Sequence, residues 1–357
     1  MTTRRAALAV LPALSAAPLV FAQVSARASP KRIGALSLGP GPEKFDPRKP
    51  LDDEGPFWDA LSKKGWVLGA NIVIERTFAD WKTDRLSGLA ADLVRKRVDV
   101  ILCNDETEMV AAARATQSIP ILFNGALTPV EQGLIESFSR PGRNLTGTSQ
   151  HAGTAVATKR LEFLRAIVRG ERLSWLWGGD SRYAETVAGG RFDIAKMYES
   201  AASGLGFNPR LHFVPAPADI DKVFEEILEW KAQAITGGGW QVFEVRDRVA
   251  EFALRNRLPL ATNHRPYVEA GGLLSYGLPQ SERNLLGERL IEYLDQILRG
   301  AKPSELPVIQ PSRYELVVNM KTARALGLTI PQSVLQRADE GHSVMANPIN
   351  QAAIQTS

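Results

Sequence analysis

Residues 65–124 begin GWVLGANIVIER and end IPILFN, and residues 204–263 repeat the same plan, beginning GLGFNPRLHFV and ending LPLATN. Each stretch starts with a glycine turn and a strand-like run, continues through a helical stretch, and reaches two further apolar runs, the last with a proline near its start. Alternation of strands and helices predicts parallel sheets with helices on both faces. Two lobes built to one plan usually face each other across a cleft, and such clefts bind small molecules. We therefore expect a two-lobed α/β protein with a ligand site between its lobes.

The N-terminus has the composition of a signal peptide. Arg4 and Arg5 precede an apolar run over 6–20, and small residues at 20–22 and 26–28 offer cleavage sites. The run is broken by proline and is too short to cross a membrane, which takes roughly 20 apolar residues. We expect residues 1–28 to be removed on export, by the general or the twin-arginine route, leaving a periplasmic protein. Cleavage after Ala22 removes Arg4 and Arg5, each +1, and no acidic residue, so the formal net charge falls from +4 to +2.

Composition and motifs exclude several classes of protein. At 357 residues and 44% hydrophobic content, the chain is typical of a globular protein with two domains. No cluster of Lys and Arg indicates a nucleic-acid partner. Cys103 is the only cysteine, so no intramolecular disulfide forms, and we interpret it as a core residue at a strand end. The four histidines lack metal-ligand spacing, and no nucleophile elbow or P-loop is present. We expect neither catalysis nor a metal or cofactor.

Local patterns predict the order of elements along the chain. Strands are expected at 32–38, 71–78, 98–103, 119–123, 173–177, 210–214, 232–236, 258–262 and 314–319. Helices are expected at 57–64, from 84, from 104, at 183–203, from 221, at 283–299 and at 321–326. Residues 39–56 hold several Pro and Gly and are predicted to form a long loop.

Several C-terminal motifs carry a family resemblance. They are EAGGLLSYG at 269–277, ILRGAKPSELPV at 297–308, QPSRYELVVN at 310–319 and KTARALGLTIP at 321–331, with earlier matches at DLV (92–94), VDVI (98–101) and RPGRNLTG (140–147). Over residues 31–340 the chain resembles the ABC-transporter substrate-binding proteins, type 1 periplasmic binding proteins similar to the tryptophan- and tyrosine-binding ones. The resemblance implies two doubly wound parallel-sheet lobes joined by a three-segment hinge, with crossings near 144–149, 273–277 and 306–313.

This resemblance also implies a division of the chain. Residues 31–146 with 276–306 would form the first lobe, residues 147–275 with 307–340 the second, and residues 341–357 a flexible tail. The chain departs from the family in its long loop at 39–56 and in CNDET at 103–107, where small residues are usual. Both loops would face the cleft, so the identity of the ligand cannot be borrowed from aromatic amino acid binders.

Candidate ligand-binding residues follow from the rule that ligands bind beyond the carboxyl ends of parallel strands. In the first lobe the rule selects Ser37, Gly39, Asn104, Asp105, Glu106, Thr107 and Asn124. In the second lobe it selects Asp180, Ser181, Tyr183, Gly239, Trp240, Asn263 and His264, with Tyr276 on the hinge.

The residues around Thr107 have two readings. The helix that opens there has free N–H groups, which together with the helix dipole can hold a carboxylate. Asp105 and Glu106 could instead hold an ammonium group. Alternatively, all three residues only cap the helix.

The second-lobe candidates also have structural alternatives. Trp240 and Tyr183 could stack on a ring of the ligand or serve as packing residues. Asp180 and Ser181 could be an N-cap, and His264 could be a surface loop residue.

These observations favour an extracytoplasmic receptor that closes on a small polar solute, an amino acid or a related carboxylate. Its partner would be an ABC permease in the inner membrane, and the receptor itself would be a monomer. A ligand-presenting sensory subunit is an alternative. An exported α/β enzyme would need a clustered acid, base and nucleophile, and a sugar-repressor-like regulator would need a helix-turn-helix where this chain has a leader.

Overall fold

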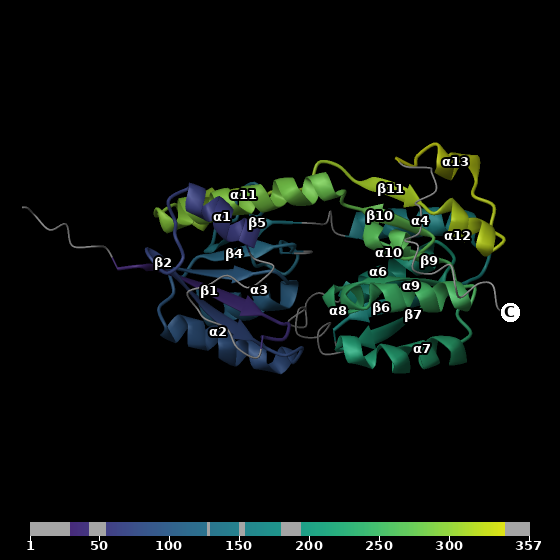
Figure 1. The fold of residues 1–357 in the computed structure, drawn as a ribbon, viewed down its shortest axis with the longest axis horizontal. Coiled ribbons are helices and arrows are strands. Elements are labelled where there is room, and N and C mark those ends of the chain that lie inside the picture. Colours follow the sequence, from purple (N-terminus) through teal and green to yellow (C-terminus); the bar gives the residue numbers. More distant parts are fainter. Residues whose placement is uncertain (1–28, 43–54, 127–128, 150–153, 180–193, 340–357) are drawn as a thin grey trace, which may run out of the picture.

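The computed structural model describes residues 29–42, 55–126, 129–149, 154–179 and 194–339. These residues form two α/β lobes that lie side by side in Figure 1. The expected signal peptide, the C-terminal tail, most of the loop at 39–56 and the start of the helix expected at 183–203 fall outside the described residues.

The first lobe is built on a five-stranded parallel sheet in the order β2-β1-β3-β4-β5. Its strands are β1 (Lys31–Ser37), β2 (Ile72–Phe78), β3 (Val100–Cys103), β4 (Ile121–Asn124) and β5 (Leu145–Thr148). Its helices are α1 (Gly55–Lys63), the 3-10 turn η1 (Thr83–Arg85), α2 (Leu86–Arg95), α3 (Glu106–Ala115), α11 (Gln280–Leu298) and the turn η3 (Pro303–Glu305), which contacts β5.

The second lobe has a six-stranded sheet in the order β11-β10-β9-β8-β6-β7, parallel except for the β10–β11 pair. Its strands are β6 (Arg172–Gly178), β7 (Asn208–Val214), β8 (Ala234–Gly238), β9 (Leu260–Thr262), β10 (Leu274–Gly277) and β11 (Glu315–Val318). Its helices are α4 (Thr154–Ile167), α6 (Ile194–Gly204), η2 (Pro217–Asp219), α7 (Ile220–Glu229), α8 (Trp240–Glu244), α9 (Arg246–Arg255), α10 (Arg265–Glu269), α12 (Met320–Ala325) and α13 (Gln332–Leu335).

The internal repeat seen in the sequence is a repeat of structure. Residues 65–124 contain β2, α2, β3, α3 and β4, and residues 204–263 contain β7, α7, β8, α8, α9 and β9. Each set takes the same places in its sheet, because β2-β1-β3-β4-β5 and β7-β6-β8-β9-β10 have the same order. The predicted fold of two parallel-sheet lobes is confirmed. In the second lobe the connection from β8 to β9 contains two helices rather than one.

Both sheets turn their carboxyl ends toward the boundary between the lobes. The chain leaves the first lobe at the end of β5 and begins α4 of the second at Thr154. It leaves β10 at Gly277 and begins α11 on the first lobe at Gln280, a step of three residues that spans at most about 10 Å. Since β5 and β10 each run parallel to a neighbouring strand, the carboxyl edges of both sheets must lie at this boundary between the lobes, which we call the gap.

The crossings expected near 144–149 and 273–277 are therefore themselves strands, β5 and β10, and the chain changes lobe just after each. The predicted divisions at 147 and 276 cut through these two strands. Gly147 and Thr148 pair with β4 in the first sheet, whereas Tyr276 and Gly277 pair with β11 in the second. The third crossing follows Ile309, whose N–H donates to the Gly147 carbonyl before the chain enters β11.

Each sheet is buried on both faces. In the first lobe one core gathers Leu93, Ile101 and Met109 beneath α2 and α3, and another gathers Leu61, Val100 and Leu294 beneath α1 and α11. The second lobe likewise has one core against α4 and α6 and another against α7 and α9. Burial on both faces explains why the strands are continuous apolar runs in the sequence instead of an alternation of apolar and polar residues.

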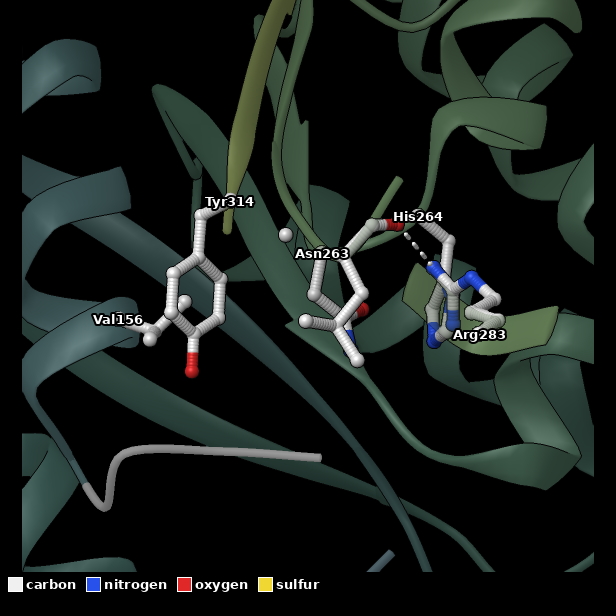
Figure 2. A pocket seen from close by; sticks show the side chains of 7 residues that line it. Val156, Asn263, His264, Arg283 and Tyr314 are labelled. Carbon is white, nitrogen blue, oxygen red and sulfur yellow. Dashed lines mark hydrogen bonds between the residues drawn. The ribbon is translucent and has the colours of Figure 1, made fainter. Parts of the chain in front are cut away.

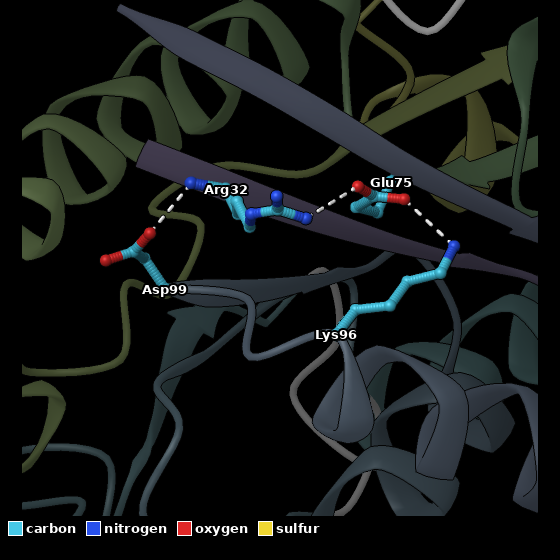
Figure 3. A network of polar contacts seen from close by, with 4 residues as sticks. All are labelled: Arg32, Glu75, Lys96 and Asp99. Carbon is cyan, nitrogen blue, oxygen red and sulfur yellow. Dashed lines mark hydrogen bonds and ion pairs between the residues drawn. The ribbon is translucent and has the colours of Figure 1, made fainter. Parts of the chain in front are cut away.

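The edge of the first sheet away from the gap is held by ion pairs. Figure 3 shows Arg32 of β1 between Asp99 and Glu75, with Lys96 on the other side of Glu75. The Arg32 N–H donates to Asp99 Oδ2 at 2.7 Å, its Nη1 to Glu75 Oε1 at 3.2 Å, and Lys96 Nζ to Glu75 Oε2 at 2.9 Å. These partly exposed contacts tie β1 to the middle of β2 and to the residue before β3, and each ion pair contributes at most about 1 kcal/mol.

A buried polar chain links β6, β7 and α7. Ser174 Oγ lies 3.1 Å from His212 Nε2, and His212 Nδ1 donates to Glu226 Oε2 at 3.3 Å. Serine, histidine and glutamate in this order can form a hydrolase relay, but Ser174 is 0% exposed, so no substrate can reach its hydroxyl. Burial lowers the pKa of His212 below its usual value, while the hydrogen bond to Glu226 opposes that shift and the positive charge of Arg210 adds to it. The group is structural, and the ring is neutral near pH 7.

The glycines at the end of β8 allow a close approach between strands. Gly237 has φ 136°, and a Cβ there would lie 2.1 Å from the Leu176 carbonyl oxygen of β6. We expect Gly237→Ala to lower the free energy of unfolding by about 2–4 kcal/mol. Gly204→Ala is the control, because Gly204 has open space around its Cα, and it should change stability by no more than about 1 kcal/mol. Urea denaturation of both variants measures the difference, and equal stabilities would contradict the assigned backbone contact.

The His212 cluster predicts a pH effect. A histidine whose folded-state pKa is depressed contributes stability above its unfolded pKa and loses it as the pH falls through the folded pKa. The wild-type protein should therefore lose more stability between pH 7 and pH 5 than His212→Gln, which cannot be protonated. Urea midpoints at the two pH values test this, and parallel losses in both proteins would refute it.

Candidate functional site

The helix α3 opens at the carboxyl edge of the first sheet with a side-chain cap. Asp105 is the N-cap residue, and its Oδ1 accepts the Thr107 N–H at 2.7 Å and contacts the Thr107 hydroxyl. Burial raises the pKa of Asp105, and the hydrogen bonds from Thr107 oppose that shift. The Asp105 side chain therefore caps the helix, as the second of the two interpretations predicts, because its carboxylate is hydrogen-bonded to Thr107. Thr107 is itself buried.

Glu108, which we did not select from the sequence, ties two strand ends together. Its side chain is almost fully buried, and its two carboxylate oxygens accept the N–H groups of Leu38 and Asn104, each at 2.6 Å. Burial first, and then the charge of Asp105, raises the pKa of Glu108 to about 8, while the two N–H donors oppose the rise. The residue fixes the loops that follow β1 and β3, which border the gap.

Glu106 connects the first lobe to the second. Its side chain is 2% exposed and contacts the Gln132 amide. Burial of the Tyr198 ring of α6 raises the pKa of that phenol, Arg160 opposes the rise, and the charge of Glu106 adds to it. The carboxylate of Glu106 therefore lies within electrostatic reach of the opposite lobe.

Tyr198 belongs to an aromatic cluster in the core of the second lobe. The Tyr198 ring lies 5.1 Å from Trp175 and 5.6 Å from Trp177, both on β6 and both buried. Beside it, Arg160 of α4 is 5% exposed, and its Nε donates to the Thr236 hydroxyl at 3.4 Å. Burial lowers the pKa of Arg160 to about 10, which still leaves it charged near pH 7.

Two polar atoms near the ends of β8 and β9 are enclosed without a hydrogen-bond partner. They are Asn263 Oδ1, which would lie 2.9 Å from a Cβ on Gly238, and the Tyr267 hydroxyl of α10. Trp240 stacks on Phe243 at 5.7 Å between ring centroids and yet is 60% exposed. Such exposure leaves one face of the indole free to cover a ligand.

A small hollow of about 10 Å³ lies where the lobes are joined, and Figure 2 shows the side chains around it. Its lining residues come from all three crossings and from the end of β9: Val156, Asn263, His264, Gly277, Leu278, Arg283 and Tyr314. Arg283 Nη2 donates to the Leu278 carbonyl at 3.0 Å, and the Glu282 carboxylate accepts the N–H and hydroxyl of Ser312 at 3.1 and 2.9 Å. The hollow holds one water at most and belongs to the hinge.

The remaining candidates fall in three groups. Ser37, Gly39 and Asn124 are half-buried at the carboxyl edge of the first sheet, where Asn124 Oδ1 accepts the Thr148 hydroxyl at 2.9 Å. Tyr276 packs instead against Phe163 of α4, with ring centroids 5.3 Å apart. Asp180, Ser181 and Tyr183 lie outside the described residues, and Gly239 takes φ 105° at the start of α8.

Among the described residues, no helix is long and apolar enough to cross a membrane. No group of three His, Cys, Asp or Glu side chains in that part of the chain could hold a metal ion.

Glu108 generates a stability prediction. Glu108→Ala removes both acceptors and should lower the free energy of unfolding by about 2–3 kcal/mol, whereas Glu251→Ala on the exposed face of α9 should change it by less than about 0.5 kcal/mol. Because the folded-state pKa of Glu108 lies above that of free glutamate, its contribution is largest below pH 4.5 and shrinks as the pH rises toward 8. Denaturation at pH 5 and pH 8 checks both statements. A cost no greater than that of the control would disprove the bridging role.

Comparisons with known proteins agree with this architecture. The sequence model of the ABC transporter substrate binding protein family matches residues 52–342. The chain is 24% identical over 279 residues to a tyrosine-binding protein of Clostridioides difficile, a match that covers 76% of this chain and 75% of the relative.

Two solved structures share the fold. A conserved domain protein of Vibrio cholerae has a TM-score of 0.67 at 23% identity, covering 87% of this chain and 98% of that one. An ABC domain of Streptococcus pneumoniae in complex with L-Trp has a TM-score of 0.65 at 22% identity, covering 87% and 99%. The family model matches most of the length of this chain, which confirms the resemblance noted in the sequence. The chain belongs to the ABC transporter substrate binding protein family.

Proposed function

We propose that this protein is the receptor of an ABC importer, which captures a small polar solute between its lobes and delivers it to a permease in the inner membrane. One observation carries the proposal: the carboxyl edges of two sheets with the same strand order border a common gap. Parallel sheets bind ligands at those edges. A solute there touches both lobes, so it stabilises the closed form through contacts that the open form lacks.

The chemistry of the walls favours an amino acid or a related carboxylate. Glu106 brings a buried negative charge to the gap, which suits an ammonium group, and the exposed Trp240 offers an aromatic face. The names of the relatives support this class, since one binds tyrosine and one was solved with L-Trp. Asn104, Asn263 and His264 complete the proposed lining at the strand ends.

The remaining proposals concern the form of the protein in the cell. Residues 1–28 would be a signal peptide, and the mature chain would act as a periplasmic monomer. The first domain would consist of residues 31–146 and 276–306, and the second of residues 147–275 and 307–340. The strand pairing moves two of these boundaries, so that all of β5 belongs to the first domain and all of β10 to the second.

Thermal shift measurements on the protein without residues 1–22 test the function. A panel of amino acids and small carboxylates should contain solutes that raise the melting temperature, since a ligand at 100 times its Kd adds about 2.7 kcal/mol of stability. If no member of the panel changes the melting temperature, the proposed solute class is wrong.

Glu106 gives a sharper test of the site. Glu106→Gln should weaken binding of an amino acid by about tenfold to a hundredfold, because it removes the charge that faces the ammonium group. Glu251→Gln, an exposed glutamate on α9, is the matched control and should bind as the wild type does. Calorimetric titration measures both, and unchanged affinity in Glu106→Gln would place the ammonium group elsewhere.

A further inference from the structure

Among the residues that the structure describes, Arg160 is a buried cation without an anionic partner. It lies on α4 and is 5% exposed, and the only hydrogen bond that it makes within that part of the chain is the 3.4 Å contact from Nε to the Thr236 hydroxyl. That hydroxyl already donates its own proton to the Ala261 carbonyl at 2.9 Å. Within the described part of the chain, no carboxylate pairs with Arg160. A guanidinium has five N–H donors, so most of its hydrogen-bonding capacity is unused.

The groups around Arg160 cannot neutralise it. Tyr198 and Tyr267 are its electrostatic neighbours, and burial raises the pKa of Tyr198 to about 12 and that of Tyr267 further. Both phenols are therefore uncharged near pH 7. The Tyr267 hydroxyl is itself enclosed and without a partner, and it can donate a hydrogen bond. Arg160 and Tyr267 thus offer donors for which the described residues supply no acceptor, and an unpaired buried charge is costly.

This cluster lies at the wall of the gap. α4 begins directly after the chain crosses from the first lobe, and Arg160 is six residues from its start, about 9 Å along the helix axis. Tyr198, which interacts with Arg160, also feels the charge of Glu106 on the opposite lobe. Arg160 keeps 5% of its surface exposed, so it is not completely sealed from solvent.

We propose that Arg160 binds the carboxylate of the captured solute. The inference rests on the proposed function. It names the residue that binds the carboxylate and the direction in which the solute lies between the two lobes. The carboxylate end of the solute is held by the second lobe, and the ammonium end meets Glu106 of the first. A solute without a carboxylate would leave Arg160 unpaired in the closed form, so the site selects carboxylates over their neutral analogues.

A structural role for Arg160 and a role in binding the solute predict different melting temperatures for the solute-free Arg160→Met protein. If Arg160 served to anchor α4 to β8, Arg160→Met would lower the melting temperature. If it is held for the solute, Arg160→Met removes an uncompensated buried charge and leaves the solute-free melting temperature unchanged or raised. Arg169→Gln, an exposed arginine just beyond α4, is the control and should have no effect on either stability or binding.

The test compares L-tyrosine and L-tryptophan with their carboxamides, in which the carboxylate is replaced by a neutral group, using calorimetric titration of the protein without residues 1–22. We expect the wild type and Arg169→Gln to bind the acid forms at least a hundredfold more tightly than the amides. Arg160→Met should lose about a hundredfold in affinity for the acids and should discriminate little between the acids and their amides.

The outcomes separate this inference from the proposed function. Equal binding of acids and amides by the wild type, or affinity within threefold of wild type in Arg160→Met, overturns the role of Arg160 and leaves solute binding intact. A melting temperature of Arg160→Met several degrees lower, restored by Arg160→Lys, also overturns it in favour of an anchor. If the wild type binds neither these acids nor any member of the wider panel, the proposed function fails and the inference with it. Since the comparison of acids with amides uses the wild type, the test stands even if a variant does not fold.

Discussion

The step from Gly277 to Gln280 constrains the rest of the molecule. Within three residues the chain passes from the second sheet to a helix on the first lobe, so the carboxyl end of β10 has to lie at the boundary. The crossing after β5 imposes the same condition on the first sheet. Parallel strands share one direction, and the loops after β1, β3, β8 and β9 are therefore brought to the same gap as the crossings themselves. The position of the candidate site follows from this connectivity.

The two walls of the gap are complementary in chemistry. The first lobe presents Glu106 on loops that Glu108 holds in place, and the second presents Arg160 among tyrosine and tryptophan rings. Glu106 contacts the Gln132 amide, and Arg160 contacts the hydroxyl of Thr236. A molecule that carries both charges would satisfy both walls at once.

The sequence predicted those parts of the fold whose signals are local. Glycine turns and apolar runs located β2, β3, β4 and their counterparts in the second lobe. LTGT and LSYG were not recognised as β5 and β10, because each contains few large apolar residues and becomes a strand only through its neighbours β4 and β9. The rule of carboxyl ends found Glu106, Asn263 and Trp240 at the boundary. It missed Arg160, whose neighbours Lys159 and Glu162 suggest an exposed helix face, and whose burial is decided by α6 and β8.

The helix α11 belongs to the first lobe although it lies more than 130 residues beyond the last strand of that lobe. It supplies Ile291, Leu294 and Ile297 to the core beneath α1, and Asp295 accepts the indole N–H of Trp66, 229 residues away in the chain. A nascent chain that ends before α11 has only α1 to cover that face of the first sheet. The lobe whose strands are synthesised first therefore completes its core only after α11 has been made, and contacts of such long sequence separation slow folding.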